Sequence, residues 1–377
     1  MTKKPSYRFA GYTEVWEEKK LGEVAELLNG RAYKQEELLE DGEYRVLRVG
    51  NFNTNDRWYY SDLQLEDSKY ANYGDLLYLW ATNFGPELWK EEKVIYHYHI
   101  WKISGYSNIL DKYYFYTFLE KDKDRIKQNT NGSTMVHITK GMMEERVLTF
   151  PSLPEQTAIG SFFQDIDQLI SLQQRKLEVL KEQKKTYLKL LFPAKGQKKP
   201  ALRFAGFEDE WTSVLLGDIS ELYQPKTISS EELLTEGFPV FGANGYIGYY
   251  KDYNHKEDQV TISARGEGTG TPSFVEGPVW ITGNSMVVNV EKQANIIKPF
   301  LYAFCLSFNF KPFVTGGAQP QLTREVLKKV NIMLPSLPEQ EAIGAFFQDL
   351  DKAIAKQEEK VNQLKESKQT LLRKMFI

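Results

Sequence analysis

The sequence contains a single cysteine, Cys305, among 377 residues. No disulfide can therefore form within the chain, and because Cys305 lies in the apolar run LYAFCLSF we expect it to be a small buried hydrophobe. Long apolar runs are also missing: no stretch of 18 or more apolar residues occurs, and none follows the N-terminal MTKKPSYRF. These absences argue against a membrane span and a signal peptide, so we expect a cytoplasmic protein with no membrane partner.

Signatures of nucleotide chemistry are scarce as well. The glycine-rich GEGTG at 266–270 lacks the third glycine and the strand-to-helix context of a dinucleotide-binding loop. No Asn-Pro-Pro-aromatic segment is present, so the adenine-flipping pocket typical of amino-methyltransferases is missing. We expect no bound cofactor.

Two patterns suggest a metal but are weak. Asp75 followed by the EEK run at 91–93 loosely resembles a metal-dependent nuclease triad, yet 26% of the residues are charged, so chance produces such patterns. Asp75 fits better at the end of a turn before a strand. His97 and His99 alternate in YHYHI, as they would on one strand face, but neither has an obvious Cys or acidic partner. We expect no catalytic site and no metal site.

Charge of one sign is not in excess. The net charge is -3, and only residues 151–199 are mildly basic, with 9 basic and 5 acidic side chains. A simple electrostatic nucleic-acid binder shows a stronger basic footprint, so composition alone does not suggest DNA. Apolar residues make up 41% of the chain and aromatic residues 14%. The chain is therefore globular, and its length suits two domains.

What the sequence does have is an internal repeat. From Pro151 to Asp167, 14 of 17 positions recur unchanged at an offset of 184, so that LPEQTAIGSFFQDID is matched by LPEQEAIGAFFQDLD. The earlier segment YRFAGYTEVWEEKKLGEVAEL recurs as LRFAGFEDEWTSVLLGDISEL, which aligns Arg8 with Arg203 at an offset of 195. A period near 190 residues indicates a duplicated domain rather than a solenoid.

A long helix is predicted after each copy of the Pro-Glu-Gln phrase. Ser152 with Glu155, and Ser336 with Glu339, match the S-x-x-E capping box, with proline in the first turn. The first helix is expected to stop at the linker FPAKGQKKP, and the second runs to the end of the sequence.

Both helices carry an apolar seam. Its first copy comprises Ile159, Phe162, Ile166, Leu169, Gln173, Leu177, Leu180, Lys184, Tyr187 and Leu191, and its second Ile343, Phe346, Leu350, Ala353, Gln357, Val361, Leu364, Lys368, Leu371 and Met375. This spacing predicts a coiled coil with one stutter around Gln173 and Gln357. Two independent amphipathic helices, each packed on its own domain, are the alternative. The seams run far past the end of a domain face, which favours an intramolecular antiparallel pair.

The regions between these features read as mixed α/β. Strand-like runs rich in β-branched and aromatic residues are GDLLYLW, KVIYHYHIWKI, DQVTISA and GPVWITGNSMVVNV. The segments ILDKYYFYTFLEK and IKPFLYAFCLSF read as helices. The predicted fold class is α/β (α+β).

Together these segments resemble the specificity (S) subunits of type I restriction–modification systems. The doubled Pro-Glu-Gln phrase and the entry motif RFAGFEDEWTSVLLGDI carry the resemblance, as do YGDLLYLWATNFGPELWKEEKVIYHYHIWKI, TISARGEGTGTPSFVEGPVWIT, NGSTMVHITKG and GGAQPQLTRE. The resemblance implies two target recognition domains separated by a long antiparallel two-helix coiled coil, with an internal pseudo-twofold repeat. The implied boundaries are 1–150 for the first recognition domain, 151–192 for the first long helix, 193–201 for a linker, 202–334 for the second recognition domain and 335–377 for the second long helix.

The resemblance also implies a function. Such a subunit binds a bipartite, asymmetric sequence in double-stranded DNA and recruits two methyltransferase subunits, with restriction subunits in the full complex. Those partners supply the S-adenosylmethionine site, adenine methylation and ATP-driven cleavage, so this chain is expected to be non-catalytic. The constant phrase is expected to contact the other helix and two identical partner subunits, because repeated surfaces bind repeated partners.

Polar loop side chains are the candidates for reading base edges, because their donors and acceptors match those of the bases. They are Thr82, Asn83, Lys90, Ser133 and Thr134 in the first domain, and Asn244, Arg265, Thr269, Gln319 and Gln321 in the second. The expected helix-pair or partner interface comprises Phe162, Ile166, Leu169, Leu180, Tyr187, Phe346, Leu350, Val361, Leu364 and Leu371.

Rival functions remain open at this point. One is an enzyme in its own right, a nuclease or a methyltransferase, against which the missing motifs argue. A second is a coiled-coil scaffold that binds only protein. A third is the specificity subunit of a related type II-like restriction–methylation enzyme.

Overall fold

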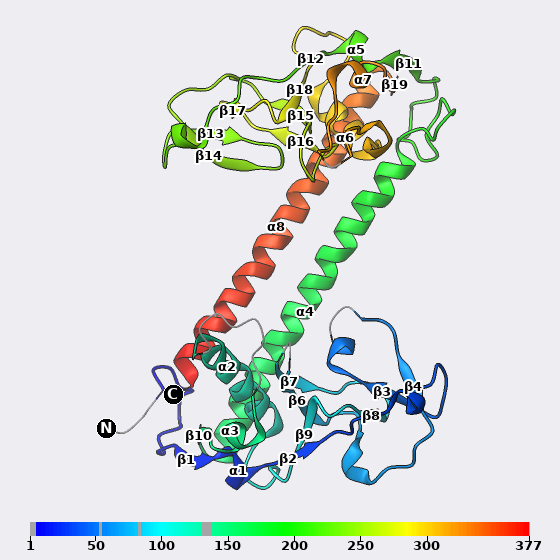
Figure 1. Cartoon of the computed structure of the whole chain (residues 1–377). Coiled ribbons are helices and arrows are strands. Elements are labelled where there is room, and N and C mark those ends of the chain that lie inside the picture. Colours follow the sequence, from blue (N-terminus) through cyan, green and yellow to red (C-terminus); the bar gives the residue numbers. More distant parts are fainter. Residues whose placement is uncertain (1–4, 53–54, 82–83, 130–137, 318, 377) are drawn as a thin grey trace. The chain divides into compact units, whose positions relative to one another are not determined.

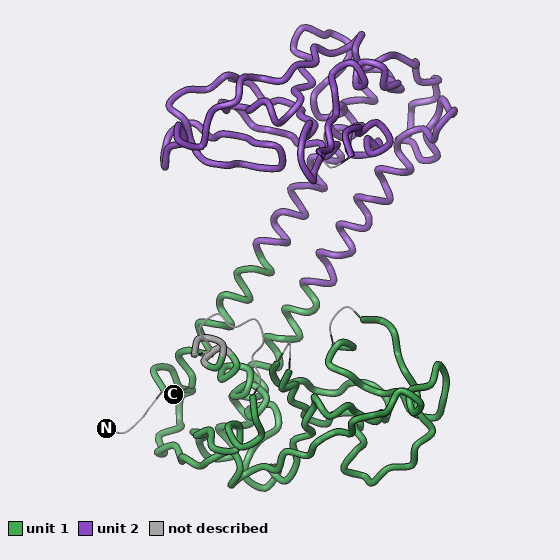
Figure 2. The backbone as a smooth tube through the Cα atoms, in the orientation of Figure 1, with its two compact units in different colours: residues 1–173, 360–377 green, residues 174–359 purple. Residues whose placement is uncertain are grey.

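A computed structural model describes residues 5–52, 55–81, 84–129, 138–317 and 319–376 (Figure 1). The chain divides into two compact units (Figure 2). Unit 1 comprises residues 1–173 and 360–377, and unit 2 comprises residues 174–359. Each unit therefore contains part of both long helices, whereas the sequence suggested that the helices are modules apart from the domains.

The described residues of unit 1 form two four-stranded sheets and a two-stranded ribbon. The sheet orders are β2-β9-β6-β7 and β4-β3-β8-β5, and β1 pairs with β10. Its strands are β1 (Glu17–Lys20), β2 (Glu26–Asn29), β3 (Tyr44–Leu47), β4 (Tyr59–Ser61), β5 (Tyr70–Ala71), β6 (Leu76–Leu79), β7 (Gly85–Leu88), β8 (Val94–Tyr96), β9 (Ile100–Ser104) and β10 (Val147–Phe150). Its shorter helices are α1 (Leu21–Val24), α2 (Lys112–Asn129) and α3 (Lys140–Glu144).

Unit 2 repeats this plan. The sheet orders are β12-β18-β15-β16 and β14-β13-β17, and β11 pairs with β19. Its strands are β11 (Thr212–Leu215), β12 (Glu221–Tyr223), β13 (Phe238–Phe241), β14 (Tyr246–Tyr250), β15 (Gln259–Ser263), β16 (Pro272–Val275), β17 (Trp280–Ile281), β18 (Ser285–Asn289) and β19 (Asn331–Leu334). Its shorter helices are α5 (Leu216–Ile219), α6 (Lys298–Ser307) and α7 (Arg324–Leu327). The predicted α/β class and the predicted duplication are both confirmed.

Two of the predicted strand-like runs each form two strands, and GPVWITGNSMVVNV contributes β17 and β18 to different sheets. The run KVIYHYHIWKI forms β8 in one sheet and β9 in the other, joined by a tight turn at 97–99. The backbone N–H of Ile100 donates to the carbonyl of His97 at 3.0 Å, which closes that turn. The expectation that His97 and His99 alternate on one strand face was therefore wrong.

The long helices are α4 (Leu153–Leu190) and α8 (Leu337–Met375) (Figure 1). In unit 1 the C-terminal part of α8 completes the core, where the ring centroid of Phe376 lies 5.2 Å from that of Tyr114. In unit 2 the chain just after α4 does the same, with Phe192 lying 5.6 Å from Phe300. These contacts exclude the alternative of two independent helices, each packed on its own domain.

Ion pairs give the direction of the helix pair. In unit 1, Lys368 binds Asp167 at 2.6 Å, and in unit 2, Lys184 binds Asp351 at 2.5 Å. The residue number rises by 17 along α4 between these pairs and falls by 17 along α8, so the helices are antiparallel. The two pairs are also equivalent in the repeat, since each partner in one is offset by 184 from its counterpart in the other.

The seam needs one correction at Leu169. This side chain is 41% exposed, whereas the adjacent Ile170 is buried. In the second copy Ile354 is half-buried and Ala353 exposed. With isoleucine at both places the seam from Ile166 alternates steps of four and three residues, so the two successive steps of four lie at Phe162–Ile166–Ile170 and the stutter is not around Gln173 as predicted.

The Pro-Glu-Gln phrase attaches each long helix to its own unit. Both carboxylate oxygens of Glu155 accept from the guanidinium of Arg8 at 2.6 Å, and Glu339 binds Arg203 in the same bidentate way at 2.7 Å. Both glutamates are almost completely buried. The predicted capping box is not formed by these side chains, whose side-chain hydrogen bonds in the described residues come from the arginines of the entry motif.

The glutamine and glycine of the phrase serve the same attachment. Gln156 donates to the carbonyls of Ile109 and Pro151, and Gln340 donates to those of Asn295 and Pro335. A Cβ at Gly160 would lie 2.6 Å from the backbone nitrogen of Tyr114, so only glycine permits this approach to α2. Much of the phrase is thus constant because it holds the helix to its own domain, and not only because of the other helix or partners.

The lone cysteine fits the expectation. Cys305 is fully buried in α6 within the unit 2 core, and burial raises the pKa of its thiol to about 12.

Candidate nucleic-acid interface

In unit 2 three loop segments meet, which we call the unit 2 loop cluster: the turn at 242–245, the loop at 264–271 and the described residues of 315–322. Arg265 and Gln321 form an antiparallel bridge, and the Thr269 hydroxyl lies 3.2 Å from the carbonyl of Pro320. The Asn244 side chain lies against Gly268, since a Cβ there would come within 2.1 Å of its oxygen. The fold thus brings together segments that are more than 70 residues apart in the sequence.

The predicted unit 2 residues all lie in this cluster. Asn244, Arg265, Gln319 and Gln321 are exposed, as base-reading side chains must be. Thr269 differs, because its hydroxyl is half-buried and donates to the carbonyl of Gly266 at 2.6 Å. We interpret Thr269 as a residue that shapes the loop rather than one that contacts a base.

Of the predicted unit 1 residues, the structure describes only Lys90. Thr82, Asn83, Ser133 and Thr134 lie outside the described residues. Lys90 is exposed but follows β7, at the opposite end of that strand from the β6–β7 connection. The fold therefore separates Lys90 from the loops that correspond to the unit 2 cluster, and we no longer count it among the candidates.

The unit 1 loop cluster comprises the described residues of 48–58, 80–84 and the turn at 97–99. The indole N–H of Trp80 donates to the carbonyl of Tyr98 at 2.7 Å, and the Trp80 ring centroid lies 4.8 Å from that of His99. The backbone N–H of His97 donates to the carbonyl of Leu47, which precedes the 48–58 segment. The 97–99 turn therefore bridges the other two segments.

The same backbone bonds frame both clusters. The N–H of Trp80 donates to the carbonyl of His99 at 3.2 Å, and Trp80 accepts from the N–H of Ile138. In unit 2 the N–H of Ala264 donates to Asn284 at 2.9 Å, and Ala264 accepts from Leu322. Equivalent bonds thus position two sets of unlike side chains.

Sequence reasoning missed several residues of the unit 1 cluster. The guanidinium carbon of Arg48 lies 4.3 Å from the ring centroid of Tyr59, and that of Arg57 lies 5.0 Å from the same ring. Tyr98 is exposed at the tip of the 97–99 turn. The missed signal was RVLRVGNFNTNDRWYY, in which three arginines are interleaved with aromatic residues.

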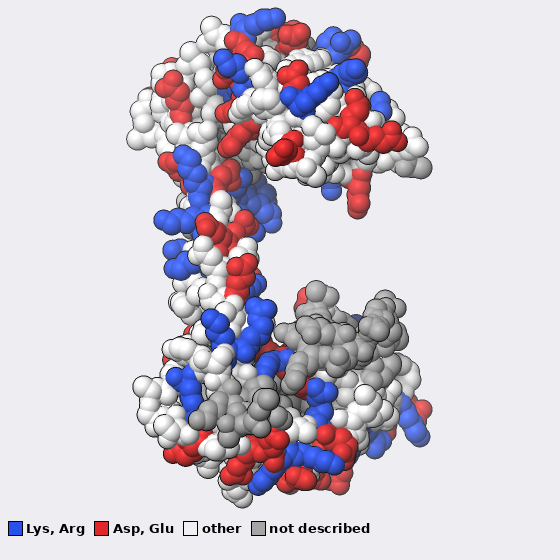
Figure 3. Space-filling view, turned by 90° about the vertical axis from the view of Figure 1, so that its left-hand side faces the viewer, with Lys and Arg blue, Asp and Glu red and all other residues white. Residues whose placement is uncertain are grey.

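His97, the first residue of the 97–99 turn, is neutral near pH 7. Burial, the neighbouring His99 and the charge of Arg48 together lower the pKa of His97 from 6.5 to about 4. In the view of Figure 3, acidic and basic side chains are interspersed over the described surface of both units.

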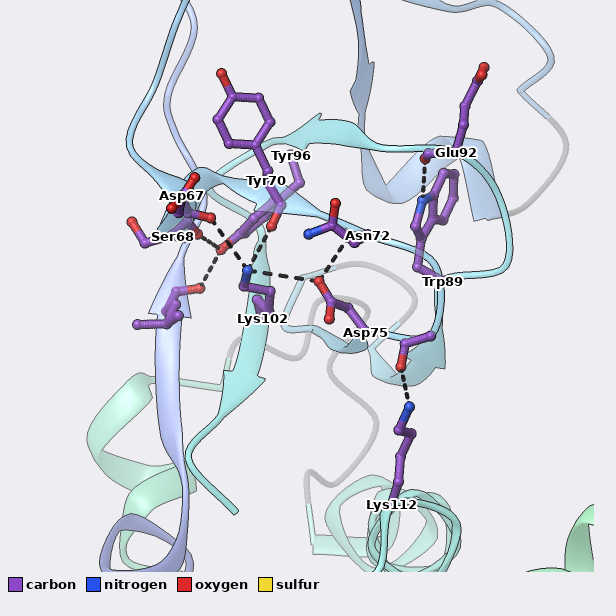
Figure 4. A network of polar contacts seen from close by, with 12 residues as sticks. Asp67, Ser68, Tyr70, Asn72, Asp75, Trp89, Glu92, Tyr96, Lys102 and Lys112 are labelled. Carbon is purple, nitrogen blue, oxygen red and sulfur yellow. Dashed lines mark hydrogen bonds and ion pairs between the residues drawn. The ribbon is translucent and has the colours of Figure 1, made fainter. Parts of the chain in front are cut away.

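The nuclease-like residues have structural partners instead, and those of Asp75 are shown in Figure 4. Asp75 accepts from the backbone N–H of Asn72 at 2.8 Å and lies 3.7 Å from the ammonium of Lys102. Glu91 is paired with Arg45 at 2.8 Å, and Lys93 lies over the ring of Tyr70. Asp75 therefore closes a turn before β6, as expected.

The Lys102 ammonium joins the parts of this network. It donates to the carbonyls of Tyr70 at 2.8 Å and Asp67 at 3.4 Å, and Tyr96 donates to the nearby carbonyl of Ser68 (Figure 4). Lys102 in β9 lies opposite Leu77 in β6. The equivalent pair in unit 2 is Val287 in β18 opposite Thr261 in β15. The network thus ties the two sheets of unit 1 together where unit 2 uses an apolar contact.

Neither a metal cluster nor a membrane span is found in the part of the chain that the structure describes. No group of three or more His, Cys, Asp or Glu side chains among those residues could hold a metal ion. None of the helices traced there is long and apolar enough to cross a membrane.

The predicted helix-interface residues are mostly placed in the helix pair or against the cores. Phe162, Ile166 and Leu371 pack on the unit 1 core, and Tyr187 and Phe346 lie 5.1 Å apart in unit 2. Val361 is buried, and the half-buried positions are Leu180, Leu350 and Leu364. Leu169, as noted, faces outward.

Comparison with known proteins gives consistent matches. A specificity subunit of a type I restriction enzyme, MjaVIII, from Methanocaldococcus jannaschii is 24% identical over 336 residues, covering 80% of this chain and 78% of that protein. A putative type I specificity subunit from Mycoplasma genitalium is 23% identical over 273 residues, covering 71% of each. The crystal structure of a type I restriction–modification S subunit from M. genitalium matches with a TM-score of 0.71 at 19% identity, covering 100% of this chain and 99% of that one.

The family model described as the type I restriction modification DNA specificity domain matches residues 13–182 and again residues 208–366. The two matches lie one in each half of the internal repeat and together cover most of the chain. The chain therefore belongs to the family of type I restriction–modification DNA specificity proteins, and it carries two copies of the family's domain.

Proposed function

We propose that this chain is the sequence-reading subunit of a type I restriction–modification complex. Unit 1 reads one half of a bipartite, asymmetric DNA target through its loop cluster, and unit 2 reads the other half. The chain supplies recognition, and two methyltransferase subunits, with restriction subunits in the full complex, supply the chemistry.

The main support for this proposal is that the two units share the same framework contacts but present different loop side chains. The Arg8–Glu155 and Arg203–Glu339 pairs, and the backbone bonds around Trp80 and Ala264, recur in both units. The side chains that this frame presents do not recur, since one cluster offers arginines and aromatic rings and the other offers Asn244, Arg265, Gln319 and Gln321. Two readers built alike but presenting different donors and acceptors suit two different half-sites.

The outward face of α4 supports partner binding. Leu169, Leu172 and Val179 are 41%, 61% and 50% exposed on this helix. Exposed apolar side chains that recur along one helix favour a protein contact. Their counterparts on α8 are Ala353, Lys356 and Gln363, so this apolar face is not repeated and supports a protein contact at α4 alone.

Genome-wide mapping of methylated adenine tests the proposal. Cells that carry this gene with the genes of its methyltransferase partners should show one bipartite methylated motif, and cells lacking only this gene should lose it. Unchanged methylation without the gene would favour the scaffold alternative. Methylation by the purified chain alone would make it an enzyme in its own right.

A further inference from the structure

Two arginine–aromatic stacks lie close together in unit 1 and differ in charge balance. Arg45 in β3 lies over Trp58 at 4.6 Å and is neutralised by Glu91 at 2.8 Å and Glu92 at 3.2 Å. The second stack is formed by Arg48 and Arg57 over the single ring of Tyr59, at 4.3 and 5.0 Å. We call these three residues the arginine pair stack.

The arginine pair stack has no counter-charge in the described residues. No carboxylate there lies within ion-pair distance of Arg48 or Arg57, and Asp56, next to Arg57 in the sequence, makes no such contact. The Nε atom of Arg48 is buried without a hydrogen-bond acceptor. Two like charges on one ring, with a buried donor unsatisfied, raise the free energy of the unbound protein.

The loop nevertheless holds the two arginines in place. Arg48 donates through Nη2 to the carbonyl of Arg57 at 3.1 Å, and its backbone N–H donates to the side chain of Asn51 at 3.0 Å. Asn51 in turn donates to the carbonyls of Asn55 and Arg57. The charges are therefore positioned before any ligand arrives, which lowers the entropy cost of binding an anion.

The location of the stack identifies the anion. Arg48 directly follows β3 and is near enough to His97 for its charge to act on that imidazole, so the stack adjoins the 97–99 turn of the unit 1 loop cluster. The corresponding turn of unit 2, Gly-Ala-Asn-Gly at 242–245, contains no arginine. Two adjacent cations match a charged phosphate better than a neutral base edge, which one bidentate arginine suffices to read.

We propose that Arg48, Tyr59 and Arg57 form a site for DNA backbone phosphate, which anchors unit 1 on its half-site without reading bases. This inference rests on the proposed function, because it presupposes that the unit 1 loop cluster faces DNA. The anchor belongs to unit 1 alone, so the two units hold the duplex backbone by different means.

The test uses the full chain assembled with its methyltransferase subunits and a duplex that contains the methylated motif. The variant Arg48→Gln with Arg57→Gln should bind more weakly, and its log-affinity should fall less steeply with log salt, by about 0.9 for each phosphate that the variant no longer neutralises. If the two arginines neutralise two phosphates, raising salt from about 50 to 200 mM should weaken wild type about tenfold more than the variant. The methylated motif should not change, because binding to phosphate carries no sequence information.

Two further variants serve as controls. Arg45→Gln removes an arginine that also stacks on an aromatic ring but is already neutralised, so its salt dependence should match that of wild type. Arg48→Lys with Arg57→Lys keeps both charges and should restore the steep salt dependence. Circular dichroism melts verify that each variant is folded before binding is compared.

Two results would overturn the inference. An unchanged salt dependence in the folded Gln variant would mean that the arginines do not meet phosphate. A change in one half of the methylated motif would mean that they read bases. Neither result touches the proposed function, which fails only if the wild-type complex does not select the motif.

Discussion

At the scale of single residues, the buried glutamates of the repeated phrase carry a large share of the attachment between helix and domain. Glu155 is 0% exposed and Glu339 is 1% exposed, and each binds its arginine through two short hydrogen bonds. Removing one partner of a buried pair leaves the other charge without compensation, which costs about 3 to 5 kcal/mol.

We therefore expect Glu155→Ala to destabilise unit 1 and Glu339→Ala to destabilise unit 2, each by about 3 kcal/mol or more. Hydrogen exchange measured by mass spectrometry would show reduced protection within one unit for each variant. Each variant is the matched control for the other. Equally reduced protection across both units in either variant would contradict this assignment.

His97 provides a test by pH. Its pKa is about 4 in the folded protein against 6.5 for an ordinary histidine, because burial, His99 and Arg48 disfavour the charged form. Between these values the unfolded chain takes up a proton that the folded chain refuses. The contribution of His97 to the free energy of unfolding should therefore be fully present above pH 6.5 and should be lost as the pH drops toward 4.

The His97 contribution should be about 1 to 2 kcal/mol after allowance for partial solvent screening. His97→Phe keeps a ring beside Tyr33 and Tyr98 but cannot titrate. Denaturant unfolding at pH 7 and pH 4.5 should show a smaller loss of stability for this variant than for wild type. The same loss in both proteins would exclude His97 as the cause.

At the scale of elements, the antiparallel register of α4 and α8 depends on ion pairs in the seam. Asp351→Lys alone places two positive charges together in unit 2, where Lys184 is 18% exposed. We expect it to destabilise the protein by about 1 to 3 kcal/mol. Adding Lys184→Asp reverses the pair and should restore most of the original stability.

A double-mutant cycle measures this coupling by denaturant unfolding. Asp349 is the control position, because its side chain is 79% exposed on the same helix. Lys184→Asp should not compensate Asp349→Lys. Absence of any recovery in the Asp351 double variant would mean that the register between the helices is wrong.

The elements could be predicted from sequence where a pattern extends over many residues. The duplication and the two long helices follow from repeats and periodicity, which do not depend on distant contacts. Which single positions of the pattern are buried was harder to predict, because Leu169 and Ile170 both fit a helical face and only packing decides between them. The role of Glu155 was misjudged for a similar reason. Its local sequence matches a capping box, but its carboxylate binds Arg8, which is 147 residues away.

The candidate site was predictable only in part. Asn244, Arg265, Gln319 and Gln321 could be chosen because turn-forming residues mark their loops. Lys90 looked equally suitable, but antiparallel strand pairing places its loop at the other end of β7. The arginine pair stack could not be predicted, because whether an arginine is neutralised depends on residues such as Glu91 that follow more than 40 positions later.

At the scale of the whole molecule, both long helices run from one unit into the other. Inserting one heptad after Arg175 and another after Glu359 keeps the antiparallel register and lengthens each helix by about 10 Å. If the helices set the distance between the half-sites, the unspecified gap in the methylated motif should lengthen by up to about three base pairs. Both half-sites should stay the same, since no loop cluster is altered.

The control is a single insertion after Arg175, which disrupts the register and should reduce activity without giving a defined longer gap. Methylome sequencing reports each outcome. An unchanged gap at full activity in the paired insertion would mean that the helices do not set the spacing.

Each unit is proposed to read its own half of the target, and a domain exchange is the decisive test. Residues 202–334 are replaced by the matching segment of another family member that keeps an arginine at position 203, so that Glu339 retains its partner. We expect methylome sequencing to show that one half of the methylated motif changes and the other half stays as in wild type. A motif in which both halves change, or in which neither does, would contradict this proposal.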